Sequence, residues 1–247
     1  MARHFTSASS QSLSAASAPV TATALTLACW LNPVAANVAY ELFGISDGTT
    51  TNAFRLRCGS GGSAGNVLAV TSPGGSATST TSFSAGVWTH VCGTFTSATA
   101  RAVYLNGGGK GTGSASGTPS GLSQTNIGGG AGGTFTNGDM AECAIWNVAL
   151  TDADVVVLAR GVSPFQIRPD ALVFYVPIWG TYSPEVNLMS TTTMALTGTP
   201  AAAAHPRVFY NRGHPVGKFP TAAAVVVGEF HNQYPDFLPE RTGMIAY

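Results

Sequence analysis

The sequence predicts an all-β protein in which two antiparallel sheets pack face to face as a sandwich, accompanied by one short helix. Three observations lead to this fold class. Apolar and polar residues alternate with a period of two, glycine-rich turns separate the alternating stretches, and only 9% of the 247 residues are charged. Short alternating strands with regularly spaced turns are typical of sandwiches and barrels. The spacing of the turns favours the two-sheet sandwich.

The first half of the chain carries the clearest strand patterns. Within residues 25–31, three leucines and a cysteine alternate with Thr26, Ala28 and Trp30, which places one side of the strand on a core. Residues 54–58 alternate in the same way and place two arginines on a wet outer face. Further strands are expected at residues 67–70, 87–95, 102–106 and 140–146. The predicted core contains Trp88, Val91, Phe95, Leu105, Ile145 and Leu158.

One short helix is expected after Leu150. Thr151 is the candidate N-cap, and Asp154 lies three residues later, as in a capping box. An apolar run follows at residues 155–159, and Arg160 with Gly161 supplies the usual end of a helix.

The composition changes after Pro164, because ten of the fourteen prolines fall between that residue and Pro239. Residues 172–179 still form a strand pattern, which Pro177 moves to a sheet edge. From residue 201 onward there is no sustained periodicity. We therefore divide the chain into a sandwich at residues 1–200 and an extended arm at residues 201–247. The arm's large aromatic residues are the candidate assembly contacts: Phe209, Tyr210, Phe219, Phe230, Tyr234 and Phe237.

The charge balance excludes several classes of partner. Eleven basic and eleven acidic residues give a net charge of zero, which argues against nucleic acid and against an anionic membrane surface. The first thirty residues lack the apolar core of a secretory signal. No apolar run approaches the roughly 20 residues of a spanning helix.

The four cysteines, Cys29, Cys58, Cys92 and Cys143, form no closely spaced pair. Each lies in a strand-like stretch, where a free cysteine packs as a small apolar residue. Buried free thiols are the favoured interpretation, and a disulfide is the alternative. The spacing does not fit a zinc site.

Motifs for catalysis are weak. Residues 61–65 match the nucleophile pattern G-x-S-x-G, but they lie in a turn between two strands rather than between a strand and a helix. Residues 128–133 match a dinucleotide pattern without a βαβ unit around it. A glycosidase needs two carboxyl groups roughly 5–9.5 Å apart, whereas Asp139 and Glu142 would alternate to opposite faces. We expect no catalytic residue, no cofactor and no enzyme.

Aromatic and histidine side chains also have ordinary structural interpretations. His90 alternates with Trp88 and Cys92, which predicts a packed, hydrogen-bonded histidine rather than a metal ligand. Several tryptophans could line a sugar platform, although their strand-like context favours the core. These are Trp30, Trp146 and Trp179.

Three stretches, taken in order, resemble laminin-G-like domains. TATALTLACWLNP at residues 21–33 resembles their opening strand. Residues 88–107 resemble their W-x-H-V strand and the hairpin that follows, and GDMAECAIWNVAL at residues 138–150 resembles their closing strand. The resemblance implies a concanavalin-A-like jelly roll. Many relatives carry an acidic pair in the closing strand, where this chain has Ala141 before Glu142.

Some such relatives bind calcium through loop oxygens. By that resemblance, the candidate calcium ligands are Asp47, Asn52, Asn137 and Asp139. The same residue types are favoured in tight turns for conformational reasons alone, and this turn role is the preferred interpretation.

Residues 171–199 resemble a segment that often precedes such a domain, and this order with a proline-rich tail is similar to laminin-G-like proteins of tailed phages. The resemblance implies a non-enzymatic structural protein of the virion, such as a capsid decoration protein docked on the major capsid protein or another virion protein, and a homo-oligomer. The alternative is a glycan-binding module of a phage adhesin or of a secreted, extracellular bacterial protein.

Overall fold

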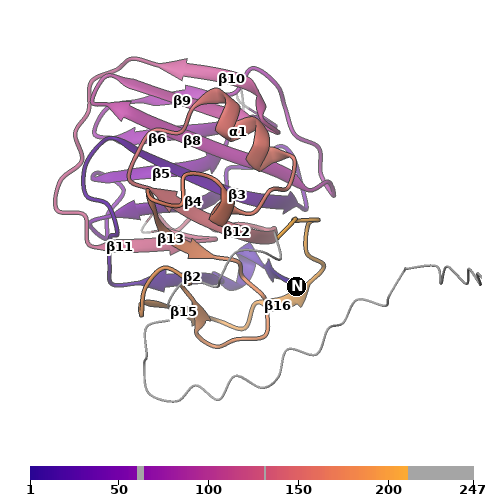
Figure 1. The fold of residues 1–247 in the computed structure, drawn as a ribbon. Coiled ribbons are helices and arrows are strands. Elements are labelled where there is room, and N and C mark those ends of the chain that lie inside the picture. The colour runs from indigo at the N-terminus through magenta and orange to yellow at the C-terminus, as the bar shows by residue number, and fades with distance from the viewer. Residues whose placement is uncertain (60–63, 131, 211–247) are drawn as a thin grey trace, which may run out of the picture.

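The structure is a computed structural model that describes residues 1–59, 64–130 and 132–210. Two eight-stranded antiparallel sheets pack against each other, which confirms the predicted sandwich (Figure 1). Sheet A contains, in spatial order, β10 (Gly108–Gly113), β9 (Ala100–Leu105), β8 (Thr89–Ser97), β3 (Leu25–Pro33), β12 (Gly138–Trp146), β1 (Ala2–Phe5) and β16 (Ala201–Ala203), and β13 (Leu172–Val176) also pairs with β12. Sheet B contains β14 (Glu185–Val186), β15 (Thr193–Thr197), β2 (Ser12–Ala15), β11 (Gln124–Ile127), β4 (Glu41–Ser46), β5 (Ala53–Cys58), β6 (Val67–Ser72) and β7 (Ser76–Thr78).

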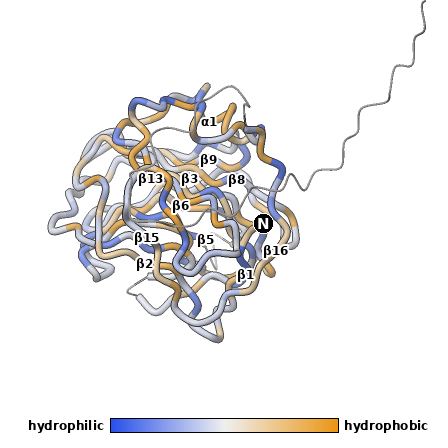
Figure 2. Tube along the Cα trace, turned by 60° about the horizontal axis from the view of Figure 1, so that its bottom comes forward, coloured by the Kyte–Doolittle hydropathy of each residue, from blue (hydrophilic) through white to orange (hydrophobic). Residues whose placement is uncertain are grey.

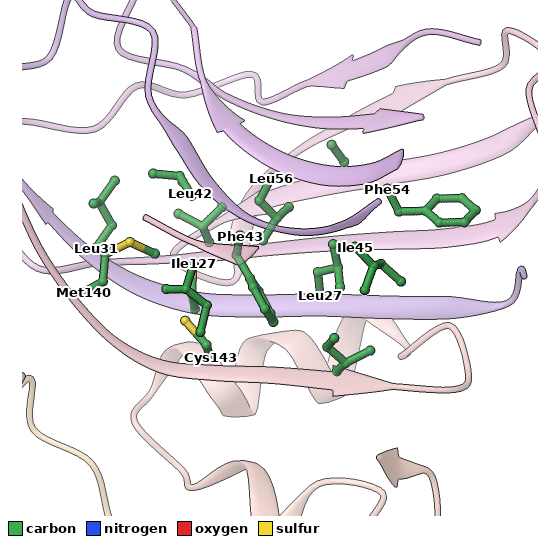
Figure 3. Close-up of a cluster of buried hydrophobic side chains, with 14 of the residues drawn as sticks. Leu27, Leu31, Leu42, Phe43, Ile45, Phe54, Leu56, Ile127, Met140 and Cys143 are labelled. Carbon is green, nitrogen blue, oxygen red and sulfur yellow. The ribbon is translucent and has the colours of Figure 1, made fainter. Parts of the chain in front are cut away.

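The main core fills the space between the two sheets, where the apolar side of each strand faces the other sheet (Figure 3). Phe54 of β5 meets Phe95 of β8 with ring centroids 5.1 Å apart, so the aromatic rings bridge the sheets. All four cysteines are buried and free, as the sequence predicted. Five of the six predicted core residues are buried: Val91, Phe95, Leu105, Ile145 and Leu158.

Trp88 is the exception among the predicted core residues, because it is only partly buried. The strand expected from residue 87 begins at Thr89. Trp88 is separated from His90 and Cys92 by even numbers of residues, so an extended chain points all three side chains to the same side of the sheet. Cys92 belongs to the cluster on the outer face of sheet A rather than to the inter-sheet core. Its removal therefore creates a smaller cavity than the one expected for a buried tryptophan.

A second core lies on the outer face of sheet A, beneath helix α1 (Asp152–Ala159) (Figure 1). The predicted capping box is present, since Thr151 and Asp154 exchange both hydrogen bonds. Gly161 takes the left-handed conformation, with φ of 87°, as expected after a helix end. Trp146 is buried here and donates its indole N–H to the Ile167 carbonyl at 2.7 Å. Two 3-10 turns complete the described elements, η1 (Ser7–Ser9) and η3 (Pro164–Gln166).

The segment after α1 adds strands to both sheets. β13 pairs with β12 and ends directly before Pro177, in agreement with the predicted edge position. β16 pairs with β1, so the N-terminus lies beside β16 (Figure 1 and Figure 2). The sandwich therefore continues into the first residues of the predicted arm. No helix among the described residues is long and apolar enough to cross a membrane.

Some predicted features fall on positions that the structure does not describe. Four of the six candidate assembly contacts lie outside the described residues: Phe219, Phe230, Tyr234 and Phe237. Residues 61–63 of the G-x-S-x-G match and residue 131 of the dinucleotide match also lie outside them.

Candidate functional site

The outer face of sheet B carries no helix within the described parts of the chain, unlike the outer face of sheet A. Strand register places a row of small and polar residues across its middle. Ser14 pairs with Asn126, Asn126 with Gly44, and Gly44 with Arg55, across β2, β11, β4 and β5. Because directly paired residues point to the same side of a sheet, this row forms one surface.

Gly44 borders a hollow in that surface, and strand β5 packs closely against it. A Cβ atom at Gly44 would lie 2.7 Å from the Phe54 carbonyl oxygen and 2.9 Å from Arg55 Cγ. The hollow holds about 10 Å³, which is room for about one water molecule. Its lining residues come from β4, β5, β11 and two loops: Glu41, Gly44, Ser46, Thr49, Thr50, Arg55, Asn126, Gly129 and Gly130.

A buried carboxylate between two arginines provides the charge of the hollow. Glu41 is 5% exposed, and its Oε2 atom lies 3.3 Å from Arg55 Nη1 and 2.9 Å from Arg57 Nε. Arg55 Nη2 also donates to Ser72 Oγ at 3.0 Å. Burial raises the pKa of Glu41, and this effect is larger than the opposing effect of Arg55 and Arg57.

Some polar atoms of this group remain unsatisfied. Glu41 Oε1 and Arg55 Nε are buried and have no hydrogen-bond partner among the described residues, and Arg57 Nε likewise makes no hydrogen bond there, although it lies 2.9 Å from Glu41 Oε2. A buried polar atom without a partner costs about 1–3 kcal/mol. Glu41 and Arg55 both line the hollow, so a group with one buried acceptor and one buried donor without partners adjoins a space the size of one oxygen atom.

The loop from β4 to β5 forms the rim of the hollow. Asp47 accepts hydrogen bonds from the Thr49 hydroxyl at 2.7 Å, the Thr49 backbone N–H at 2.8 Å and Asn52 Nδ2 at 3.0 Å. These bonds, led by that from the Thr49 hydroxyl, lower the pKa of Asp47. Asp47 and Asn52 thus hold the turn in shape, and the turn presents Thr49 and Thr50 to solvent.

The candidate calcium ligands belong to separate networks. Asp47 and Asn52 bond to each other, whereas Asp139 accepts from Asn32 Nδ2 at 3.0 Å and lies 2.7 Å from His4 Nδ1. In the part of the chain that the structure describes, no three His, Cys, Asp or Glu residues form a metal-binding group.

Glu142 has a different environment from Asp139. It occupies a bulge of β12 with a left-handed φ of 58° and is buried. Tyr175 and Tyr210 donate hydroxyl hydrogen bonds to its carboxylate at 2.5 and 2.7 Å, and His205 Nε2 lies 3.2 Å from Oε1. The candidate assembly contact Tyr210 therefore contacts its own sandwich. The other described one, Phe209, exchanges backbone hydrogen bonds with Gly161 and Ser163.

His90 is packed as predicted, but its ring is not hydrogen-bonded as predicted. Its ring lies edge-on to Trp30 with centroids 5.3 Å apart, while Nδ1 is buried without a partner among the described residues. Burial lowers the pKa of His90 to about 3, so the ring is neutral. Of the three tryptophans assigned to the core, Trp146 is fully buried, and Trp30 and Trp179 are only partly buried.

The chain belongs to the concanavalin A-like lectin/glucanases superfamily, whose laminin-G pattern matches residues 7–156. A putative carbohydrate-binding protein from Bacteroides ovatus has a similar structure, with a TM-score of 0.59 and 18% sequence identity; the match covers 83% of this chain and 61% of that one. This similarity shows a shared fold, and the chain spans less than two thirds of the Bacteroides protein.

Two further solved structures are more distant. Domain 4 of an extracellular arabinanase from Geobacillus stearothermophilus, in complex with arabinotriose, has a TM-score of 0.46 and 20% identity, with 57% of this chain and 68% of that chain covered. A pentraxin from Limulus polyphemus has a TM-score of 0.47 and 19% identity, with 77% and 90% covered. A search of curated protein sequences found no match.

Proposed function

We propose that this protein is a carbohydrate-binding module that holds a sugar hydroxyl in the hollow on sheet B. One observation carries the proposal: Glu41 and Arg55, which have a buried carboxylate oxygen and a buried guanidinium N–H without partners among the described residues, both line a space of about 10 Å³ on an open sheet face. Membership of a superfamily named for lectins supports the proposal. So does the fold shared with the putative carbohydrate-binding protein of Bacteroides ovatus.

The proposed contact uses both vacant atoms at once. A sugar hydroxyl donates its proton to Glu41 Oε1 and accepts a hydrogen bond from Arg55 Nε, so it satisfies one buried acceptor and one buried donor. Arg57 holds the other oxygen of Glu41 in place. Gly44 and Gly130 both line the hollow, and a side chain at either position would crowd it, because a Cβ atom would lie 2.9 Å from Arg55 Cγ at Gly44 and 3.1 Å from Glu41 Cγ at Gly130.

The proposed activity is binding without turnover. Hydrolysis of a glycosidic bond normally needs two carboxyl groups on either side of the bond. Among the described residues that line the hollow, Glu41 is the single acid, and its two arginine neighbours occupy the oxygen that faces them. We propose that the protein acts outside the cell that produces it, where polysaccharides occur.

A role in a virus particle stays a prediction from the order of the chain's segments. The family match and the similar structures reported above include no virion protein, and they favour the glycan-binding alternative. Capsid partners and a homo-oligomer accordingly form no part of this proposal.

Titration calorimetry with neutral gluco-, galacto-, manno- and arabino-oligosaccharides tests the proposal. We expect at least one series to bind, and Arg55→Ala to weaken its binding about tenfold or more, since a hydrogen bond to a charged group contributes about 1.5–3 kcal/mol. Arg168→Ala is the matched control, because that arginine is exposed and its nearest acid is 3.8 Å away. Binding by no series, or equal binding by Arg55→Ala and wild type at equal melting temperature, would overturn the proposal.

A further inference from the structure

The outer face of sheet A carries the partly exposed Trp30 beyond the area that α1 covers, and the partly exposed Trp88 lies just before β8. Helix α1 packs over the rows of Ala28 and Ala102, and the next row contains Trp30 paired with His90. Trp88 directly precedes β8 and is two residues from His90, which places it diagonally from Trp30. Diagonal neighbours on one sheet face lie within reach of aromatic side chains. We name Trp30, Trp88, Asn32 and Asp139 the tryptophan face.

Trp30 is held in place from one side. The neutral His90 ring packs edge-on against the indole and is 2% exposed, so it forms a firm base in the sheet. The backbone N–H of His90 donates to Asn106 Oδ1 at 2.9 Å, which fixes the neighbouring hairpin to this row. The part of the indole that His90 does not cover is partly exposed.

A polar pair follows in the next row. Asn32 pairs with Asp139 across β3 and β12, and Asn32 Nδ2 donates to Asp139 Oδ2 at 3.0 Å. His4 Nδ1 lies 2.7 Å from the other carboxylate oxygen. Both oxygens of Asp139 therefore have partners, and the amide is fixed in orientation. Asn32 Oδ1 is buried and has no hydrogen-bond partner in the described structure, although the Asn32 residue is partly exposed.

We propose that the tryptophan face is a second carbohydrate site, which takes a pyranose ring. The ring's C–H side lies on the exposed indole surface, and one of its hydroxyls donates to Asn32 Oδ1. A pyranose combines an apolar flat side with a hydroxyl rim, and the face offers an aromatic surface and an unpaired acceptor in adjacent rows. A purely apolar partner would leave that acceptor unsatisfied. This inference rests on the proposed function and adds a separate site to it.

The two sites point in opposite directions, because they lie on the outer faces of the two packed sheets. A single sugar chain would therefore not fill both sites directly. One protein molecule would instead connect two glycan chains, and densely displayed glycans would bind it far more tightly than free oligosaccharides, by raising the effective concentration at the second site.

Calorimetric stoichiometry and tryptophan fluorescence, measured with the same oligosaccharides, test the second site. We expect two ligands per chain and a change in fluorescence for the wild type. Trp88→Ala should bind one ligand, and Trp30→Phe should weaken one of the two sites at least fivefold. Trp179→Ala is the control, since this tryptophan is also partly exposed but packs near Tyr182, with centroids 5.9 Å apart.

The outcomes separate the two proposals. If Arg55→Ala removes all binding while Trp88→Ala and Trp30→Phe bind like wild type, the sheet B site stands and the tryptophan face is overturned. If Arg55→Ala binds like wild type while Trp88→Ala loses all binding, the tryptophan face stands and the sheet B site is overturned. Absence of sugar binding by the wild type overturns both. A dimer in sedimentation experiments that Trp88→Ala does not form would overturn the tryptophan face alone.

Discussion

At the scale of single residues, Gly44 determines the shape of the proposed sugar site. Its neighbours in the row, Asn126 and Arg55, carry polar side chains, and the missing side chain between them lets Arg55 Cγ lie close to the Gly44 backbone at the edge of the hollow. The close approach of the Phe54 carbonyl means that no larger residue fits there without movement of β5.

Gly44→Ala tests this role. The new methyl group would lie 2.7 Å from the Phe54 carbonyl oxygen, and such overpacking typically costs about 1–3 kcal/mol. We expect that loss in urea unfolding, together with loss of sugar binding at 20 °C (about room temperature), where the variant is still folded. Gly108→Ala is the control, since its Cβ would meet no atom within 4 Å. Equal binding by Gly44→Ala and wild type would contradict the assigned role.

The lowered pKa of His90 should make the free energy of unfolding depend on pH. Its pKa is lowered to about 3 in the folded protein from an ordinary value of 6.5. Between these two values the unfolded chain takes up a proton that the folded chain does not, so the free energy of unfolding falls as pH falls. The slope from this residue is at most about 1.4 kcal/mol per pH unit.

Denaturant unfolding at several pH values between 4 and 7 (roughly the window of this titration) checks the prediction. His90→Gln cannot take up the proton, and we expect its unfolding free energy to depend less steeply on pH than that of the wild type. Parallel slopes for the two proteins would show that His90 does not cause the dependence.

At the scale of elements, the sequence predicted the strands with clear alternation, but it missed others, among them β4, which carries Glu41 and Gly44, and it did not predict which strands pair. The alternation around Leu27 is a local property that survives in β3, and the Thr151–Asp154 box correctly placed the start of α1. Glu41 meets Arg55 and Arg57 because β4 pairs with β5 across a bulge. A pattern of neighbouring residues in the sequence cannot predict this pairing. The sequence feature that could have indicated this group is the pair Arg55 and Arg57, at alternate positions in a chain with only eleven basic residues.

A buried ion pair connects β1 to β14. Arg3 Nε lies 2.6 Å from Glu185 Oε1, both side chains are almost completely buried, and Arg3 also donates to the Pro200 carbonyl at 2.7 Å. Glu185→Ala should lower the free energy of unfolding by about 3–5 kcal/mol, because it leaves a buried guanidinium without its carboxylate.

Asp170→Ala provides the comparison for that measurement. It removes an exposed acid 3.8 Å from Arg168 and should cost less than about 1 kcal/mol. Similar losses in the two variants, measured by the same denaturant titration, would mean that the Arg3 pair contributes no more than a surface pair.

At the scale of the whole molecule, residues 201–210 belong with the sandwich rather than with a separate arm. They supply β16, the backbone bonds of Phe209 to Gly161 and Ser163, and two of the groups around Glu142. The sequence placed a boundary after residue 200 because periodicity stops there. The pairing of β16 with β1 joins residues about 200 positions apart, and the periodicity of a local stretch cannot predict it.

Two shortened chains test the contribution of this segment. A chain that ends at Pro200 leaves the buried Glu142 with the Tyr175 hydroxyl alone and removes the pairing of β16. We expect it to be less stable by about 2 kcal/mol or more than a chain that ends at Tyr210, because buried polar groups lose their partners. Thermal and urea unfolding of the two chains would measure the difference. Equal stability would place the boundary back at residue 200.

The position of β1 and β2 also has a consequence for how the protein is made. His4 pairs with Asp139 on one side and with Ala201 on the other, and Leu13 pairs with Ile127 and with Leu196. During synthesis on a ribosome, β1 and β2 emerge long before β16 and β15, so they must wait for nearly all the described chain before both of their edges are paired. Unpaired edges invite association with other chains, so newly made copies are most vulnerable to aggregation before their last strands appear.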